Sequence, residues 1–256
     1  MSFEEIEISY PAACLFQITI NRPRQFNALS AQTIIELLSA LETFERSEDR
    51  VMILTGAGRA FCFGADFLEF ENRSALHGLL SDFQSLISRL YHSTKVTVAS
   101  LNGFATGAGF DLALACDFRI ASDKAKLGEA YISMGLVPDG GGTCFLPRII
   151  GESRALEMLM TGGAVSADQA FSMGLVHRVV PASELTAASL AFVVDLAAKP
   201  QTALRLIKRL VKSTAGEDLN SALQKEREAQ LQCFEDADHQ KLAAEFIAKR
   251  RKSGPT

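Results

Sequence analysis

The sequence has few of the residues that build metal centres and disulfide frameworks. Its four histidines lie far apart in the chain, and none has the spacing of a metal-ligand pair. Its five cysteines are scattered, odd in number and without a CxxC pair. We therefore expect no zinc site and no disulfide framework, and reduced thiols are typical of a cytoplasmic protein.

Long apolar runs and an excess of positive charge are also missing. No segment approaches the roughly 18 uninterrupted apolar residues of a membrane span. The first ten residues, "MSFEEIEISY", are acidic and do not resemble a signal peptide. Lys and Arg total 26 against 30 acids, a net charge of −4, whereas nucleic-acid binding usually needs a basic face. We expect no membrane or nucleic-acid partner and a cytoplasmic location.

Common nucleotide and hydrolase motifs are absent as well. The sequence contains neither a GxxxxGK[ST] P-loop nor a GxSxG nucleophile elbow. "GFATGAGFDLA" superficially resembles a dinucleotide fingerprint, but Asp111 replaces its third glycine and no acid follows at the ribose spacing. A nicotinamide cofactor is therefore not expected.

What the sequence does contain is the pattern of an α/β domain. Residues 3–10 and 14–20 alternate apolar and polar side chains, and 50–56 form a short apolar run, so all three predict strands. Residues 29–49 lie between the last two and predict a helix that Ser30 can cap. The theme repeats with a helix at 76–92, a strand at 95–103, a helix at 109–117 and a strand at 117–122.

The predicted secondary structure becomes mainly helical after Gly142. Residues 154–162, 166–174, 184–199 and 202–249 predict helices, and only 176–180 predicts a strand. The pattern indicates two domains, an α/β core at 1–195 and a helical region at 196–256.

Three glycine-rich turns could carry chemistry. They are "GAGRAFCFGADF", "LNGFATGAGFDLALACD" and "MGLVPDGGGTCFLPRIIG". Small residues there indicate either tight packing or a ligand that approaches backbone N–H groups, and two such turns in one chain favour a ligand. In the third turn Asp139 precedes three glycines. It could form the turn, cap a helix that starts around Thr143, or act as a catalytic base.

Five blocks resemble, in order, the signatures of the enoyl-CoA hydratase/isomerase (crotonase) superfamily across about residues 5–250. They are "INRPRQFNALS", "AFCFGADF", "LNGFATGAGFDLALACDFRIAS", "GLVPDGGGTCFLPRIIG" and "ALEMLMTGGAVSADQAFSMGLVHRVVP". The resemblance implies a crotonase (ClpP-like) spiral of ββα units in which the C-terminal helical region mediates trimerisation. It also implies an acyl-CoA thioester substrate, a homo-trimer or hexamer, and no metal or redox cofactor, since coenzyme A is part of the substrate.

The resemblance also assigns residues. It implies that the backbone amides of Ala65 and Ala108 form an oxyanion hole for the thioester oxygen. It implies further that coenzyme A lies near Arg24, Ala65, Asp66 and Phe67. On the C-terminal segment, Phe246 and Lys249 resemble a pair that reaches the coenzyme A of a neighbouring subunit.

Departures from the family pattern bear on the reaction. Hydratases of this family carry glutamates at the positions of Asp111 and Tyr131, and a tyrosine with an ordinary pKa near 10 replaces a carboxylate poorly. Glu129 matches a glutamine of the family and is interpreted as structural. Dienoyl-CoA isomerases resemble this chain at Asp111 and Asp139.

We therefore predict an enoyl- or dienoyl-CoA isomerase. Asp139 acts as the base in this prediction, and Asp111 and Tyr131 assist it. Two alternatives are a weak hydratase that uses Asp111 and a non-catalytic acyl-CoA-binding homologue.

Overall fold

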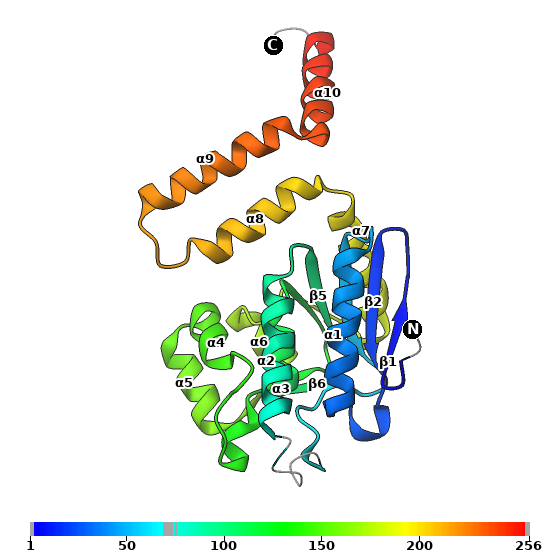
Figure 1. The fold of residues 1–256 in the computed structure, drawn as a ribbon, viewed down its shortest axis with the longest axis vertical. Coiled ribbons are helices and arrows are strands. Elements are labelled where there is room, and N and C mark those ends of the chain that lie inside the picture. Colours follow the sequence, from blue (N-terminus) through cyan, green and yellow to red (C-terminus); the bar gives the residue numbers. More distant parts are fainter. Residues whose placement is uncertain (1–2, 69–73, 75, 254–256) are drawn as a thin grey trace. The chain divides into compact units, whose positions relative to one another are not determined.

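The computed structural model describes residues 3–68, 74 and 76–253 (Figure 1). The chain divides into two compact units, Met1–Ala197 and Ala198–Thr256. The predicted boundary after residue 195 lies inside the last helix of the first unit. Within the described residues, no helix is both long enough and apolar enough to span a membrane.

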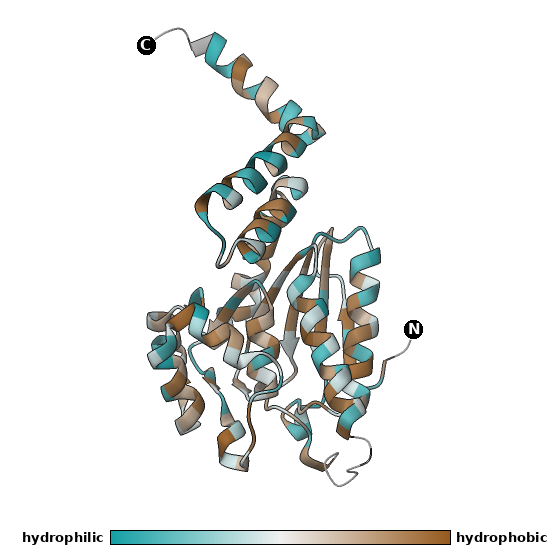
Figure 2. Cartoon of the chain, turned by 60° about the vertical axis from the view of Figure 1, so that its left-hand side comes forward, coloured by the Kyte–Doolittle hydropathy of each residue, from teal (hydrophilic) through white to brown (hydrophobic). Residues whose placement is uncertain are grey.

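A six-stranded sheet forms the centre of the first unit. The strand order is β1 (Ile6–Ser9), β2 (Leu15–Ile20), β3 (Val51–Gly56), β5 (Val96–Leu101), β7 (Phe118–Ser122) and β10 (Arg178–Val180). β1 is antiparallel to β2, and the later neighbours are parallel. All six residues of β5 are buried, as an apolar run in a covered parallel sheet requires. Figure 2 shows the brown, hydrophobic colour of these strands.

Helices connect and cover the strands. α1 (Ala31–Arg46) joins β2 to β3, and its predicted cap is present: the Ser30 side chain accepts a hydrogen bond from the Thr33 amide. α2 (Leu76–His92) has the predicted bounds and packs against α1. α7 (Leu185–Ala197) packs on β3, β5 and β7. The predicted strand–helix–strand unit is confirmed.

A second sheet was not predicted. Its order is β4 (Ala60–Cys62), β6 (Phe104–Thr106), β8 (Lys126–Gly128) and β9 (Ala164–Ser166). Each strand has three residues, too few to show a period. The prediction of a single strand after Gly142 was wrong because β9 also follows it, pairing antiparallel with β8 at the edge of this sheet.

The first unit contains further helices between and after these strands. They are the 3-10 helices η1 (Pro23–Gln25), η3 (Ala130–Met134) and η4 (Ala182–Glu184), and the helices α3 (Ala108–Ala115), α4 (Gly142–Ile150), α5 (Glu152–Thr161) and α6 (Ala167–Met173). α3 is buried along its whole length. A Cβ at Gly109 would lie 2.2 Å from the Cys62 carbonyl oxygen, so glycine lets α3 lie directly against β4.

The second unit consists of α8 (Gln201–Ser213), α9 (Leu219–Glu235) and α10 (Ala237–Ser253). These helices confirm the prediction for residues 202–249. The Thr202 hydroxyl donates to Asp236 Oδ2 at 2.6 Å and ties the start of α8 to the end of α9. Leu219, Leu223 and Phe246 are exposed, with relative areas of 71%, 50% and 63%.

Candidate active site

A cavity of about 300 Å³ opens in the first unit. Most of its wall is apolar, with Phe63, Phe67, Leu79, Phe83, Met134 and Leu136 among the contributors. These side chains come from the loop after β4, from α2 and from the segment around η3. The oxygen-bearing side chains of Thr106, Tyr131, Ser133 and Asp139 interrupt the apolar lining. The cavity therefore suits an apolar chain that presents a polar group at one point.

Two backbone amides lie on one part of this wall. Leu29 donates to the Gly64 carbonyl at 2.8 Å and accepts from the Asp66 amide at 2.9 Å, and this parallel bridge directs the N–H of Ala65 away from Leu29. Ala108 is the first residue of α3, where a helix leaves its N–H groups unpaired. Within the described residues, neither amide donates a hydrogen bond. Together they can stabilise a negative charge that develops on an oxygen.

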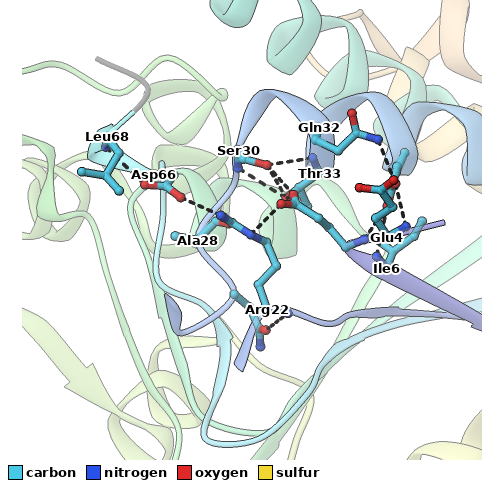
Figure 3. Close-up of polar contacts among 12 residues, drawn as sticks. Glu4, Ile6, Arg22, Ala28, Ser30, Gln32, Thr33, Asp66 and Leu68 are labelled. Atoms are coloured by element: carbon cyan, nitrogen blue, oxygen red, sulfur yellow. Dashed lines mark hydrogen bonds and ion pairs between the residues drawn. The ribbon is translucent and has the colours of Figure 1, made fainter. Parts of the chain in front are cut away.

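Arg22 holds the loop that carries Ala65 (Figure 3). Its guanidinium bonds Asp66 Oδ2 at 2.8 Å and Glu5 Oε1 at 3.0 Å, and it also donates to the Ala28 carbonyl. Asp66 Oδ1 accepts in turn from the Leu68 amide at 3.2 Å. Sequence reasoning missed Arg22 because its partners come from three separate segments, which only the folded chain brings together.

Besides these backbone amides, the site contains a cluster of acid–base side chains made of two aspartates and a tyrosine. The Tyr131 hydroxyl lies 2.7 Å from Asp111 Oδ2 and 2.9 Å from Asp139 Oδ1. Asp111 comes from α3, Tyr131 from η3 and Asp139 from the turn before α4. A hydroxyl has one hydrogen to donate, so the second contact is a hydrogen bond only when that aspartate carries a proton. Both contacts are hydrogen bonds at the same time only when one of the two aspartates is protonated.

Asp139 does not cap α4. The N-cap of this helix is Gly141, which has φ +97° and makes no side-chain capping bond. A positive φ is readily available to glycine, so the run of glycines supplies the sharp entry into the helix. The Asp139 carboxylate turns instead to Tyr131 and the cavity. The structure thus disfavours the helix-cap alternative for Asp139.

Burial changes the proton affinities of these groups. It raises the pKa of Asp111 to about 7, with a smaller contribution from the charge of Asp139, while the Tyr131 hydroxyl acts in the opposite direction. Burial likewise raises the pKa of Asp139. The pKa of Tyr131 is raised far above its usual range, first by burial and then by both aspartates. Tyr131 therefore stays a neutral hydroxyl, whereas Asp111, with a pKa of about 7, can exchange a proton near neutral pH.

Glu129 joins these residues, although the sequence interpretation made it structural. Its side chain is 0% exposed. Burial, followed by the charge of Asp111, raises its pKa to about 10. The only sequence signal was its position two residues before Tyr131, and that spacing does not reveal burial.

The other predicted binding residues lie in several places. Phe67 lines the cavity, whereas Arg24 is exposed on η1. Asp66 uses its side chain and its amide within the protein, in the contacts described above. Phe246 and Lys249 lie on α10 of the second unit. Their roles in coenzyme A binding stay predictions.

Comparisons with known proteins agree with the residue pattern. The family model described as enoyl-CoA hydratase/isomerase matches residues 11–253. A crotonyl-CoA hydratase from Syntrophomonas wolfei is 34% identical over 238 residues, which cover 91% of each chain. A 1,2-epoxyphenylacetyl-CoA isomerase from Escherichia coli is 33% identical over 253 residues, covering 96% of this chain and 97% of the relative.

Solved structures agree as well. The crystal structure of an enoyl-CoA hydratase from Bacillus anthracis superposes with a TM-score of 0.92 at 35% identity, covering 96% of this chain and 97% of the other. The fold expected from the sequence motifs, a crotonase-type α/β architecture, is confirmed. The chain belongs to the enoyl-CoA hydratase/isomerase family.

Proposed function

We propose that this protein is an acyl-CoA isomerase that moves a double bond in an enoyl- or dienoyl-CoA thioester. One observation carries the proposal: of the three acids that lie near Tyr131, the half-buried Asp139 lines the cavity, whereas Asp111 and Glu129 are fully buried. The same cavity is lined by Ala65 and Ala108. A base and an oxyanion hole thus meet at one apolar chamber.

The proposed reaction begins when the thioester oxygen accepts hydrogen bonds from the Ala65 and Ala108 amides. The Asp139 carboxylate takes a proton from the carbon next to the thioester, and the electrons of that C–H bond move toward the oxygen to form an enolate. The amides stabilise the negative charge on this oxygen. Asp139 then returns its proton two carbons further along the chain, which leaves the double bond shifted. The thioester itself acidifies the carbon, so the proposal needs no metal or redox cofactor.

Tyr131 and Asp111 support Asp139 in this proposal. The Tyr131 hydroxyl bond lowers the pKa of Asp139 against the effect of burial. A base works best when its pKa lies near the operating pH, because it is then ionised and still basic. Asp111 holds the other side of the same hydroxyl and fixes its position.

Hydration is the second candidate, favoured by the names of the compared relatives, most of which are hydratases. It would require two acid–base groups that face the same double bond. Asp111 has an exposed area of 0%, and Tyr131 occupies one of its oxygens. This placement weighs against a direct role of Asp111 in activating water.

The test supplies purified protein with 3-enoyl-CoA and 3,5-dienoyl-CoA and follows conjugation by ultraviolet absorbance. Mass spectrometry of the product separates the two reactions, since isomerisation leaves the mass unchanged and hydration raises it by one water. We expect a product of unchanged mass. A hydrated product alone would favour the hydratase alternative, and tight coenzyme A binding without turnover would favour the non-catalytic one.

Assembly and location complete the proposal. We propose a cytoplasmic homo-trimer or hexamer in which α9 and α10 bury their apolar side chains between subunits. Exposed apolar faces of this kind mark protein contacts. Light scattering on the full chain measures the molecular mass, and a monomer would contradict this assembly.

A further inference from the structure

The Glu129 carboxyl group is buried in the interior without a hydrogen-bond partner among the described residues. Both of its oxygens, and also Asp111 Oδ1, are buried without a hydrogen-bond partner in the described part of the chain. An ionised Glu129 carboxylate would lose its hydration without gaining a hydrogen bond in return. These buried oxygens need a hydrogen-bond donor, and ionised carboxylates can only accept hydrogen bonds.

The surroundings of Gly142 show that the unpaired oxygens of Asp111 and Glu129 lie close to one position. A Cβ at this position would lie 2.7 Å from Asp111 Oδ1 and 2.8 Å from Glu129 Oε1, so both unpaired oxygens border the same point of α4. Only glycine leaves room for them. Two ionised carboxylates can only accept hydrogen bonds, whereas a protonated Glu129 has an O–H to donate. A single proton on Glu129 can therefore form a hydrogen bond between one oxygen of Glu129 and Asp111 Oδ1.

The described groups around Glu129 offer no positive charge, so protonation is the way to neutralise its carboxylate. Those that face Glu129 are Asp111 on α3, Tyr131 on η3 and Asp139 before α4, all acidic. The described residues that line the cavity include no lysine, arginine or histidine. They also form no cluster of His, Cys, Asp and Glu that could hold a metal ion, as far as the described segments extend.

We infer that Glu129 carries a proton in the folded protein and acts as a positioning residue that donates a hydrogen bond to Asp111. The contacts then continue from Asp111 through the Tyr131 hydroxyl to Asp139. Glu129 ends this chain in the protein interior, and Asp139 ends it at the cavity. The catalytic part of the inference rests on the proposed function, since Asp139 is the proposed base.

The donor on Asp111 controls where the shared charge lies. A hydrogen bond from Glu129 stabilises the ionised form of Asp111. Tyr131 can then give its proton to Asp111 Oδ2 and receive one from Asp139, or the reverse, so that one negative charge moves between the two aspartates. Without the donor, Asp111 keeps its proton and the charge stays on Asp139. Glu129 thereby sets the proton affinity of Asp139 without touching the substrate.

The first test measures protein stability and needs no substrate. The pKa of Glu129 rises from an ordinary 4.5 to about 10 on folding. A raised pKa contributes stability that is fully present below the lower value and is lost as the pH rises through the higher one. Glu129→Gln keeps the size and a donor but does not titrate. The ratio of folded to unfolded wild-type protein should therefore fall, relative to this variant, by up to about tenfold per pH unit.

Urea unfolding of both proteins across neutral and mildly alkaline pH gives this ratio. A stability difference that stays constant with pH would overturn the inference. An independent measurement uses wild-type protein alone, labelled with ¹³C-glutamate. Infrared spectra should show a protonated glutamate carboxyl at about pH 8, where an ordinary glutamate is ionised. Absence of that band would also overturn the inference, even if Glu129→Gln failed to fold.

The second test addresses the positioning role through the pH profile of kcat/KM. Glu129→Met removes the donor at similar volume, so the acid limb should move to lower pH by about one unit. Glu129→Gln restores a donor and should return the limb toward the wild-type position. An acid limb that Glu129→Met leaves in place would remove the positioning role. Failure of the proposed function would instead appear as absent isomerase activity with the stability result unchanged.

Discussion

The cavity has two polar parts of its lining, here called the backbone wall and the side-chain wall, and they are built in different ways. One wall presents the backbone amides of Ala65 and Ala108, whose direction depends on the bridge to Leu29 and on the start of α3. The other presents side chains, with Asp139 and Tyr131 at the cavity. Any residue except proline can supply an amide, so the first wall tolerates sequence change. The second wall changes its chemistry with every substitution, and in the proposed mechanism it therefore decides which reaction follows enolate formation.

The side-chain wall should show the largest loss. Asp139→Asn keeps the size and can still accept a hydrogen bond from Tyr131, but it removes the base. We expect isomerisation to fall by about 100- to 10,000-fold, the usual contribution of a positioned base. Coenzyme A affinity and the melting temperature should change little, which calorimetry and thermal unfolding measure.

The matched control is Asp82→Asn, which changes an exposed carboxylate on α2. It should retain full turnover. If Asp139→Asn remained near wild type while Asp111→Asn lost activity, the base would be Asp111 and the hydratase alternative would gain support.

The backbone wall should respond to loss of a donor rather than to a change of side chain. Ala108→Pro removes one N–H at the first position of α3, where proline fits a helix well. Turnover should fall by about 100- to 1000-fold, or roughly 3–4 kcal/mol of transition-state stabilisation. Ala108→Gly retains the amide and should stay close to wild type. Equal losses in both variants would mean that the side chain, not the amide, matters at this position.

The smallest effect should come from the residue that joins the two aspartates. Tyr131→Phe removes a hydrogen bond that lowers the pKa of Asp139, so this pKa should rise further. The base works when ionised, and the acid limb of kcat/KM should therefore move to higher pH, with a loss of about tenfold at neutral pH. This direction is opposite to that expected for Glu129→Met. A shift to lower pH would show that Tyr131 does not support the ionised form of Asp139.

Much of this architecture could be predicted from local patterns. The bounds of α2 and the cap of α1 at Ser30 were predictable because helical spacing and capping depend on residues close in sequence. The glycine-rich turns predicted that backbone would line a ligand site, and Ala65 and Ala108 do line the cavity. The strands β4, β6, β8 and β9 were missed because three residues each carry no period, and their pairing partners are distant in the chain.

The sequence by itself determined the family, the main sheet and the residues worth testing, since these follow from motifs and short-range periodicity. Tertiary structure alone decided where those residues lie and which groups they contact. It showed that Asp139 reaches the cavity instead of capping α4, and that Arg22 holds the Asp66 loop. It also placed Glu129 beside Asp111, where neither residue is exposed to solvent. Burial and the approach of groups from separate segments set a proton affinity, and neither can be read from the order of residues along the chain.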